Sequence, residues 1–64
     1  MNLRERREKL KLTQTQVANL VGIGTSTYNN YELGLKSPSL INSLLVADAL
    51  GVKTYEEFRS LWKI

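Results

Sequence analysis

The side chains able to carry chemistry in this sequence are hydrogen-bonding and charged groups, and none of them forms a catalytic set. The 64 residues contain no cysteine and no histidine, so the usual nucleophile, general base and zinc ligands are missing. The six carboxylates are scattered, and the adjacent pair Glu56 and Glu57 would diverge on a helix. No glycine-rich loop could cradle a phosphate. We therefore expect no enzyme, no catalytic residue, no metal, no cofactor and no small-molecule substrate.

Positive charge is concentrated at the start of the chain. Residues 1–11 hold five basic and two acidic side chains, while the rest of the chain is neutral overall, so the net charge of +3 lies here. Such a segment can attract phosphates, or it can simply be the solvated face of a helix. Charge alone leaves both interpretations open.

The length and the apolar pattern bound the class of protein. The 64 residues fit one domain, residues 1–64. With no disulfide available, stability must come from helix packing, with or without a second copy of the chain. No apolar run approaches the roughly 18 residues that a membrane helix needs, and the basic N-terminus lacks the pattern of a signal peptide. We therefore expect a cytoplasmic protein with no membrane partner.

Hydrophobic spacing and helix-end signals predict an all-α chain of five helices. Thr13 with Gln16, and Thr54 with Glu57, have the spacing of capping boxes. Gly22 can adopt the left-handed conformation that often follows a helix. The helices are expected at about residues 2–10, 13–22, 25–33, 39–50 and 55–62.

One face of each helix is expected to supply the core. Tyr28 and Tyr31 can face it together, with their hydroxyls at its rim. Arg7 falls on the apolar face of the first helix, where an unpaired charge would be costly, so a structural partner is expected. The apolar residues predicted there are Leu3, Leu10, Val17, Ala18, Leu20, Val21, Ile23, Tyr28, Tyr31, Leu40, Leu44, Ala47, Leu50, Phe58 and Leu61.

The stretch from Gln14 to Leu33 has the pattern of a helix-turn-helix. Two helices joined by a turn of three or four residues must cross at a steep angle. The small side chain of Ala18 allows the close approach, and Gly22 allows the turn. The third predicted helix would then carry hydrogen-bonding side chains on its outer face.

Between Leu3 and Phe58 the chain contains an ordered set of runs: Leu12-Thr13-Gln14, Gly22, Tyr31-Glu32-Leu33-Gly34, Pro38-Ser39-Leu40 and Ala47-Asp48-Ala49-Leu50-Gly51-Val52. This set resembles the phage-repressor (Cro-type, lambda-repressor-like) helix-turn-helix family. The resemblance implies a five-helix DNA-binding domain with the helix-turn-helix at helices 2–3 and the third helix in the major groove of an operator. It also implies a transcriptional regulator, of the repressor type, that binds DNA as a dimer.

The same resemblance implies roles for individual residues. Asn30 is the foremost candidate for a base contact, since a carboxamide can pair with adenine N6 and N7 together. Arg7 and Glu32 match a buried ion pair between the first helix and the end of the third. The other implied base contacts are Thr25, Ser26 and Asn29. The implied DNA-backbone contacts are Gln14, Thr27, Lys36 and Ser37; Gln14 is also expected to brace the third helix.

Some residues depart from the family pattern or allow a second interpretation. Thr25 could cap the third helix instead of reading a base. The third helix carries no lysine or arginine, which suggests a site with A·T content. Arg6 stands at a usually apolar position, so its stem is expected to cover the core with its charge in water. Polar Ser43 with apolar Ile41 predicts either a rotated fourth helix or an apolar patch.

The main functional hypothesis is a homodimer, at least on DNA, bound to double-stranded DNA at a pseudo-palindromic operator with half-sites about 34 Å apart. Its dimer contacts are expected near the C-terminal end, at Ile41, Leu61, Trp62 and Ile64. The alternative is a protein-interaction module, such as an antitoxin that binds its toxin, with a large apolar outer face on the fourth and fifth helices. The chain would be either a complete minimal regulator or an isolated DNA-binding domain.

Overall fold

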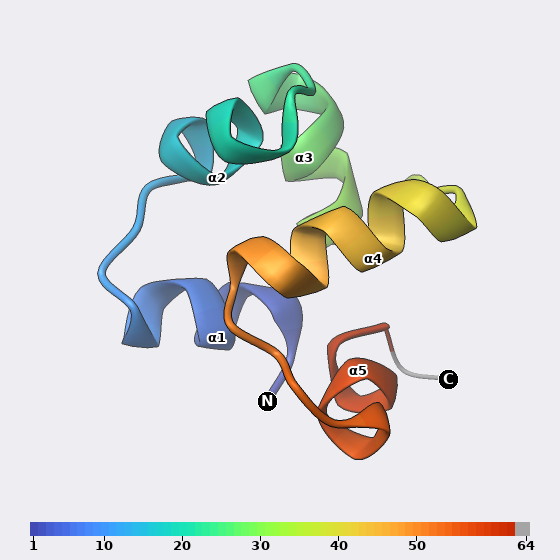
Figure 1. The fold of residues 1–64 in the computed structure, drawn as a ribbon. Coiled ribbons are helices and arrows are strands. Elements are labelled where there is room, and N and C mark those ends of the chain that lie inside the picture. The colour runs from blue at the N-terminus through green and yellow to red at the C-terminus, as the bar shows by residue number, and fades with distance from the viewer. Residues whose placement is uncertain (63–64) are drawn as a thin grey trace.

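The computed structural model describes residues 1–62, and within this range the chain is all-α, as predicted. In Figure 1, α2 and α3 lie together at one end, α1 and α5 lie at the other, and α4 runs between them. The main packing contacts join α2 to α3 and α4, and α1 to α5. The helices are α1 (Leu3–Lys9), α2 (Gln14–Val21), α3 (Thr25–Leu33), α4 (Leu40–Ala49) and α5 (Tyr55–Trp62).

Local capping residues set most helix starts. Thr13 forms the predicted capping box with Gln16, and Asn2 forms a second one with Glu5 that was not predicted from the sequence. The Thr54 hydroxyl accepts the Glu57 backbone N–H at 3.2 Å, which is one half of the capping box predicted at the start of α5. Each of these side chains satisfies a backbone donor that the first turn of a helix leaves unpaired.

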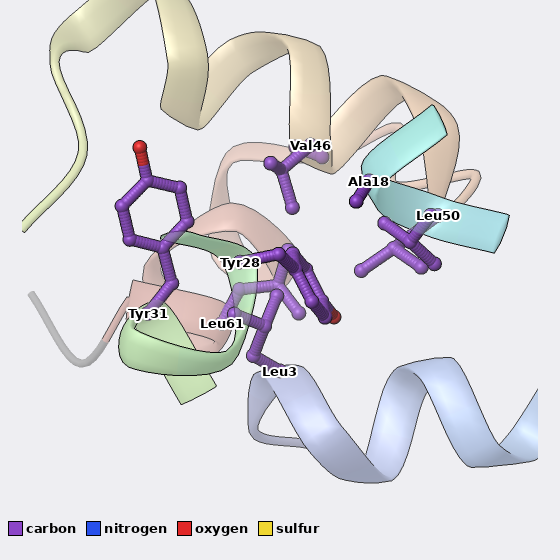
Figure 2. Packing of buried hydrophobic residues seen from close by; sticks show 9 residues of the cluster. Leu3, Ala18, Tyr28, Tyr31, Val46, Leu50 and Leu61 are labelled. Atoms are coloured by element: carbon purple, nitrogen blue, oxygen red, sulfur yellow. The ribbon is translucent and has the colours of Figure 1, made fainter. Parts of the chain in front are cut away.

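The core is centred on Tyr28, which is fully buried. Figure 2 shows its ring in the middle of the cluster, between Leu3 of α1 and Val46 of α4. Ala18 is also fully buried, as expected for the crossing of two helices. Nine buried residues, supplied by all five helices and Leu50, make up this core. They are Leu3, Val17, Ala18, Tyr28, Tyr31, Val46, Ala47, Leu50 and Leu61.

The predicted buried face of α4 was partly wrong. Leu40 and Leu44 are 72% and 53% exposed, whereas Ser43 and Val46 are buried. Ser43 tolerates burial because its hydroxyl donates to the Leu40 carbonyl at 2.7 Å. The helix is apolar on almost every side, so hydrophobic period alone could not choose the buried face.

Two other predicted core leucines lie on the surface, since Leu10 is 44% and Leu20 is 66% exposed. Each lies on or beside a short helix whose buried face is narrow: α1 buries Leu3 alone, and α2 buries only Val17 and Ala18. The prediction therefore assigned too wide an apolar face to both helices.

Arg6 corrects a further expectation. Its charge does not lie free in water: the guanidinium donates to the carbonyls of Leu50 and Gly51 at 2.9 Å each, and to Glu57 at 3.0 Å. The carbonyl of Leu50, the C-cap of α4, has no partner inside the helix, and Arg6 binds it together with the carbonyl of Gly51 in the turn that follows. Arg6 thus ties α1 to the end of α4 and to α5.

Candidate nucleic-acid interface

The α2–turn–α3 unit is closed by backbone hydrogen bonds at a left-handed glycine. Gly22 has φ of 84°. Its N–H and that of Ile23 both donate to the Ala18 carbonyl, at 2.8 and 3.0 Å. This is the geometry expected for a helix that ends in a Schellman-type turn. The helix-turn-helix predicted from Ala18 and Gly22 is confirmed.

The outer face of α3 carries short, uncharged, hydrogen-bonding side chains. Tyr28 and Tyr31 fix the opposite face in the core. Thr25 and Ser26 are exposed, and Asn29 is half-buried. Asn30 is also half-buried, and its side chain makes no hydrogen bond with another residue in the range 1–62. The four predicted base-contact residues therefore share one helix, anchored from behind by aromatic packing.

The alternative role of Thr25 as a helix cap was wrong. The N-cap of α3 is Gly24, which makes no side-chain capping bond. Thr25 is the first helical residue, and its hydroxyl lies 3.4 Å from the Thr15 hydroxyl of α2. Its side chain therefore bridges the two helices of the motif at their outer edge.

Gln14 braces α3, as the resemblance implied. Its side-chain Nε2 donates to Oδ1 of Asn29 and to Oε1 of Glu32, both at 3.0 Å. One amide at the start of α2 thus holds two consecutive turns of α3. A phosphate contact by Gln14 remains a prediction.

Arg7 and Glu32 form the predicted ion pair. Nε of Arg7 lies 2.6 Å from Oε2 of Glu32, and Nη2 lies 3.3 Å from Oε1. Their side chains are only 12% and 5% exposed. The third donor, Nη1, binds the Leu12 carbonyl at 2.9 Å. The pair fastens α1 and the α1–α2 loop to the last turn of α3.

The electrostatics of this pair follow from burial and hydrogen bonding. Burial alone would raise the pKa of Glu32, but hydrogen bonds from Arg7 and Gln14 outweigh it, and the pKa lies below its usual range. The hydrogen bond to Glu32 raises the pKa of Arg7. Burial raises the pKa of Tyr28, and the carboxylate of Glu32 adds to this effect. Tyr28 is therefore neutral and enclosed, whereas only the hydroxyl of Tyr31 reaches a polar partner at the rim, Asn42.

Most of the positive charge of α1 is used inside the molecule. Arg6 and Arg7 pair with Glu57 and Glu32, and Arg4 pairs with Glu8 at 3.3 Å. Lys9 and Lys11 are exposed and take part in no ion pair within residues 1–62. The basic segment is thus neither a continuous phosphate-binding face nor a simple solvated face.

The other predicted backbone-contact residues lie on the surface, at the end of α3 or beside its outer face. Lys36 and Ser37 are exposed in the α3–α4 loop, and Thr27 is half-buried on α3. Lys36 has no ion-pair partner in the described part of the chain, so its ammonium group is available to a phosphate. Their contacts with DNA remain predictions.

The predicted dimer residues are only partly suited to that role. Ile41 is 70% exposed, but Leu61 is buried, so Leu61 cannot form part of a contact surface. Trp62 packs edge-on against Tyr31, with ring centroids 6.1 Å apart. Ile64 lies outside the described residues. Sequence reasoning missed two exposed leucines of α4 that lie on the same helix as Ile41. These are Leu44 and Leu45.

Neither a cluster of metal-binding side chains nor a membrane-spanning helix occurs in residues 1–62. No group of three or more acidic side chains in this range could hold a metal ion. None of the helices in this range has the length and apolar character needed to cross a bilayer.

Comparisons with known proteins agree with this geometry. The model of the family described as helix-turn-helix matches residues 3–56. The chain is 35% identical over 60 residues to the cryptic phage CTXphi transcriptional repressor RstR of Vibrio cholerae, a match that covers 88% of this chain and 54% of the repressor. It is 42% identical over 55 residues to an uncharacterized HTH-type transcriptional regulator of Methanothermobacter thermautotrophicus, covering 86% and 80% of the two chains. No solved structure matches the chain significantly.

The fold and the interface together define an all-α helix-turn-helix protein of the phage-repressor-like class. The chain belongs to the helix-turn-helix family. It spans about half the length of the phage repressor that it matches.

Proposed function

We propose that this chain is a sequence-specific, double-stranded DNA-binding transcriptional regulator of phage or mobile-element type that represses from an operator. Residues 1–64 would act as one domain, in the cytoplasm. The observation that carries the proposal is the outer face of α3, which presents Thr25, Ser26, Asn29 and Asn30 on a helix held from behind by Tyr28 and Tyr31. The name of the phage relative, a transcriptional repressor, agrees with it.

In this proposal α3 enters the major groove, where some side chains contact bases and others contact the DNA backbone. Thr25, Ser26, Asn29 and Asn30 contact base edges and supply specificity. Backbone contacts position the helix without reading sequence. These contacts come from Gln14, Thr27, Lys36 and Ser37. Asn30 has its whole carboxamide available and is assigned the bidentate contact to adenine.

We further propose that two copies occupy a pseudo-palindromic operator with half-sites about 34 Å apart. The exposed apolar side chains of Ile41, Leu44 and Leu45 on α4 support a contact between copies, since such side chains gain from being covered. Ile41→Glu would leave the stability of the monomer unchanged but abolish cooperative binding to the two half-sites. Unchanged cooperativity would move the contact away from α4.

The same apolar face favours a second candidate function, which is binding of another protein. Leu40, Ile41, Leu44 and Leu45 are all at least 44% exposed on one helix. An interaction module of this kind, such as an antitoxin, would use α4 and could still bind DNA through α3. Regulation from an operator requires α3, whereas binding of a protein partner requires only α4.

A selection of bound duplexes from a random library at physiological salt tests the proposed function. An enriched pseudo-palindrome with half-sites about one turn apart is the expected result. Binding without enrichment, lost as salt rises, would show electrostatic attraction alone and would favour the protein-interaction function.

A further inference from the structure

The hydrogen bonds around Gln14 fix which end of the Asn29 carboxamide can face a ligand. The chain of bonds starts at Glu32, which Arg7 keeps as an anion and which can therefore only accept hydrogen bonds. The group of Gln14 that meets this carboxylate must be its NH₂. The orientation of the Gln14 amide is thus set by chemistry.

The same NH₂ of Gln14 also meets Asn29. Because Nε2 of Gln14 is a donor, the atom of Asn29 at 3.0 Å from it must be the acceptor Oδ1. The oxygen of Asn29 is therefore turned towards Gln14 of α2, which holds it through one of its two lone pairs. What Asn29 has left for a partner outside the protein is its Nδ2, which carries two hydrogens and no lone pair to offer.

Asn30 provides the contrast within the same helix. Its side chain makes no hydrogen bond in the described part of the chain, so both its oxygen and its NH₂ remain free. Two adjacent asparagines of identical chemistry consequently present different hydrogen-bonding patterns. Asn30 can both donate and accept, whereas Asn29 can only donate.

We propose that Asn29 reads a keto base, guanine first and thymine second, because Gln14 and Glu32 hold it as a hydrogen-bond donor. In the major groove guanine presents the acceptors N7 and O6, and thymine presents the acceptor O4. Cytosine presents only an NH₂ donor there, and adenine presents an NH₂ donor beside its acceptor N7, so a donor-only side chain meets at most one atom of adenine and leaves its NH₂ without a partner. Gln14 is then a positioning residue for specificity as well as a brace. This inference rests on the proposed function, in which α3 lies in the major groove.

The first experiment identifies the base pair that Asn29 reads and the base preferred there. Random-library selection is repeated with Asn29→Ala, and the position whose preference disappears is assigned to Asn29. In the unmodified chain that position is expected to favour guanine or thymine over adenine by about tenfold. A preference for adenine or cytosine would overturn the donor-only state while leaving the base contact. If Asn29→Ala leaves the base preference unchanged at every position, then Asn29 does not read a base, and that site assignment is overturned.

Two variants test whether the hydrogen bond from Gln14 to Asn29 sets the base preference of Asn29. Asn29→Asp keeps an acceptor for Gln14 but turns a second acceptor outward, so the preference should switch from keto to amino bases. Asn19→Asp is the matched control, since it makes the same charge change on an exposed residue of α2 and should alter no base preference. Gln14→Ala releases Asn29, and discrimination against adenine should fall to about twofold. Where Asn29→Asp binds too weakly for selection, the Gln14→Ala result decides, and undiminished discrimination overturns the proposal.

A measurement without DNA tests the hydrogen bonds of Gln14 to Asn29 and Glu32 independently of the proposed function. In isotope-labelled protein, the side-chain NH₂ of Gln14 should exchange with water several-fold more slowly than that of Gln16, because the Gln14 NH₂ donates to two partners. Gln16 is the internal control, since it is exposed and uses its oxygen in the capping box. Equal exchange rates of the two side-chain NH₂ groups would show that Gln14 does not hold Asn29, and would overturn the inference even if α3 binds DNA.

Discussion

Nε of Arg7 lies 2.6 Å from Oε2 of Glu32, and this bond joins the first helix to the last turn of the recognition helix. Because both side chains are nearly buried, removal of one partner leaves the other charge without compensation. Arg7→Met should lower the free energy of unfolding by about 3 kcal/mol or more. The double variant Arg7→Met, Glu32→Leu should recover most of this loss. Denaturant titration measures both, and a loss below about 1 kcal/mol for the single variant would contradict a buried pair.

Acid should destabilise the fold through the same carboxylate. The pKa of Glu32 is lower in the folded chain than in the unfolded chain, so the unfolded state binds more protons as pH falls. The stabilisation is therefore complete above the ordinary pKa of glutamate, and it is lost below about pH 4. Thermal unfolding at a series of pH values measures this loss. The double variant without the ion pair should show a shallower decline, and an identical decline would assign the acid sensitivity to other carboxylates.

The two glycines at either end of the turn between α2 and α3 should respond in opposite directions. Gly22 has φ of 84°, and a methyl group added there would meet no atom within 4 Å. Gly22→Ala should therefore cost about 1–2 kcal/mol from backbone strain alone. Gly24 is an extended N-cap without a capping side chain, and Gly24→Ser should gain about 0.5 kcal/mol. Circular dichroism melts compare the two. A neutral Gly22→Ala would show that the turn can relax.

The cap that Arg6 provides for α4 should be worth more than a surface ion pair. Arg6→Met removes one hydrogen bond to the C-cap carbonyl of Leu50, one to the carbonyl of Gly51 and one to Glu57, and it should cost about 1.5–3 kcal/mol. Arg4→Met is the matched control, since the Arg4–Glu8 pair is exposed and should contribute less than about 0.5 kcal/mol. Equal losses in urea titrations would mean that the cap is not a stabilising feature.

Base and phosphate contacts should separate in binding assays. Asn30→Ala should lose about 1–3 kcal/mol on one operator base pair and relax specificity there. Lys36→Ala should weaken binding to all sequences evenly and reduce the salt slope by about one. Titrations of the selected operator and its single-base variants measure both effects. Unchanged specificity with Asn30→Ala would remove Asn30 from the base-contact set.

Local signals in the sequence were enough to place the helices and the motif. Thr13 with Gln16 predicts where α2 starts, and Gly22 predicts where it ends, since capping and positive φ depend only on neighbouring residues. The burial of Tyr28 and Tyr31 follows from their spacing on a helix with no other large buried side chain. The Arg7–Glu32 pair followed from the family resemblance.

The remaining features depend on contacts that the sequence does not encode locally. Arg6 meets the carbonyl of Leu50, 44 residues away, and nothing around Arg6 marks that partner. The left-handed Gly51 already ends α4 through its own N–H and that of Val52, so no unfilled helix end in the sequence points to a distant arginine. The donor-only state of Asn29 likewise requires the positions of Gln14 and Glu32 together.

The recognition helix depends on the rest of the chain for its shape. Its N-cap is a glycine that offers no capping side chain, and it contains two asparagines with weak helix propensity and buries only Tyr28 and Tyr31. Nine residues of this kind would not hold a helix alone in water. A peptide of residues 25–33 should therefore be unstructured, and a graft that transfers only its outer residues should fail on a scaffold without an equivalent of the core that surrounds Tyr28. The proposed base contacts of α3 are in this sense a property of the whole cooperative fold, gained and lost together with it.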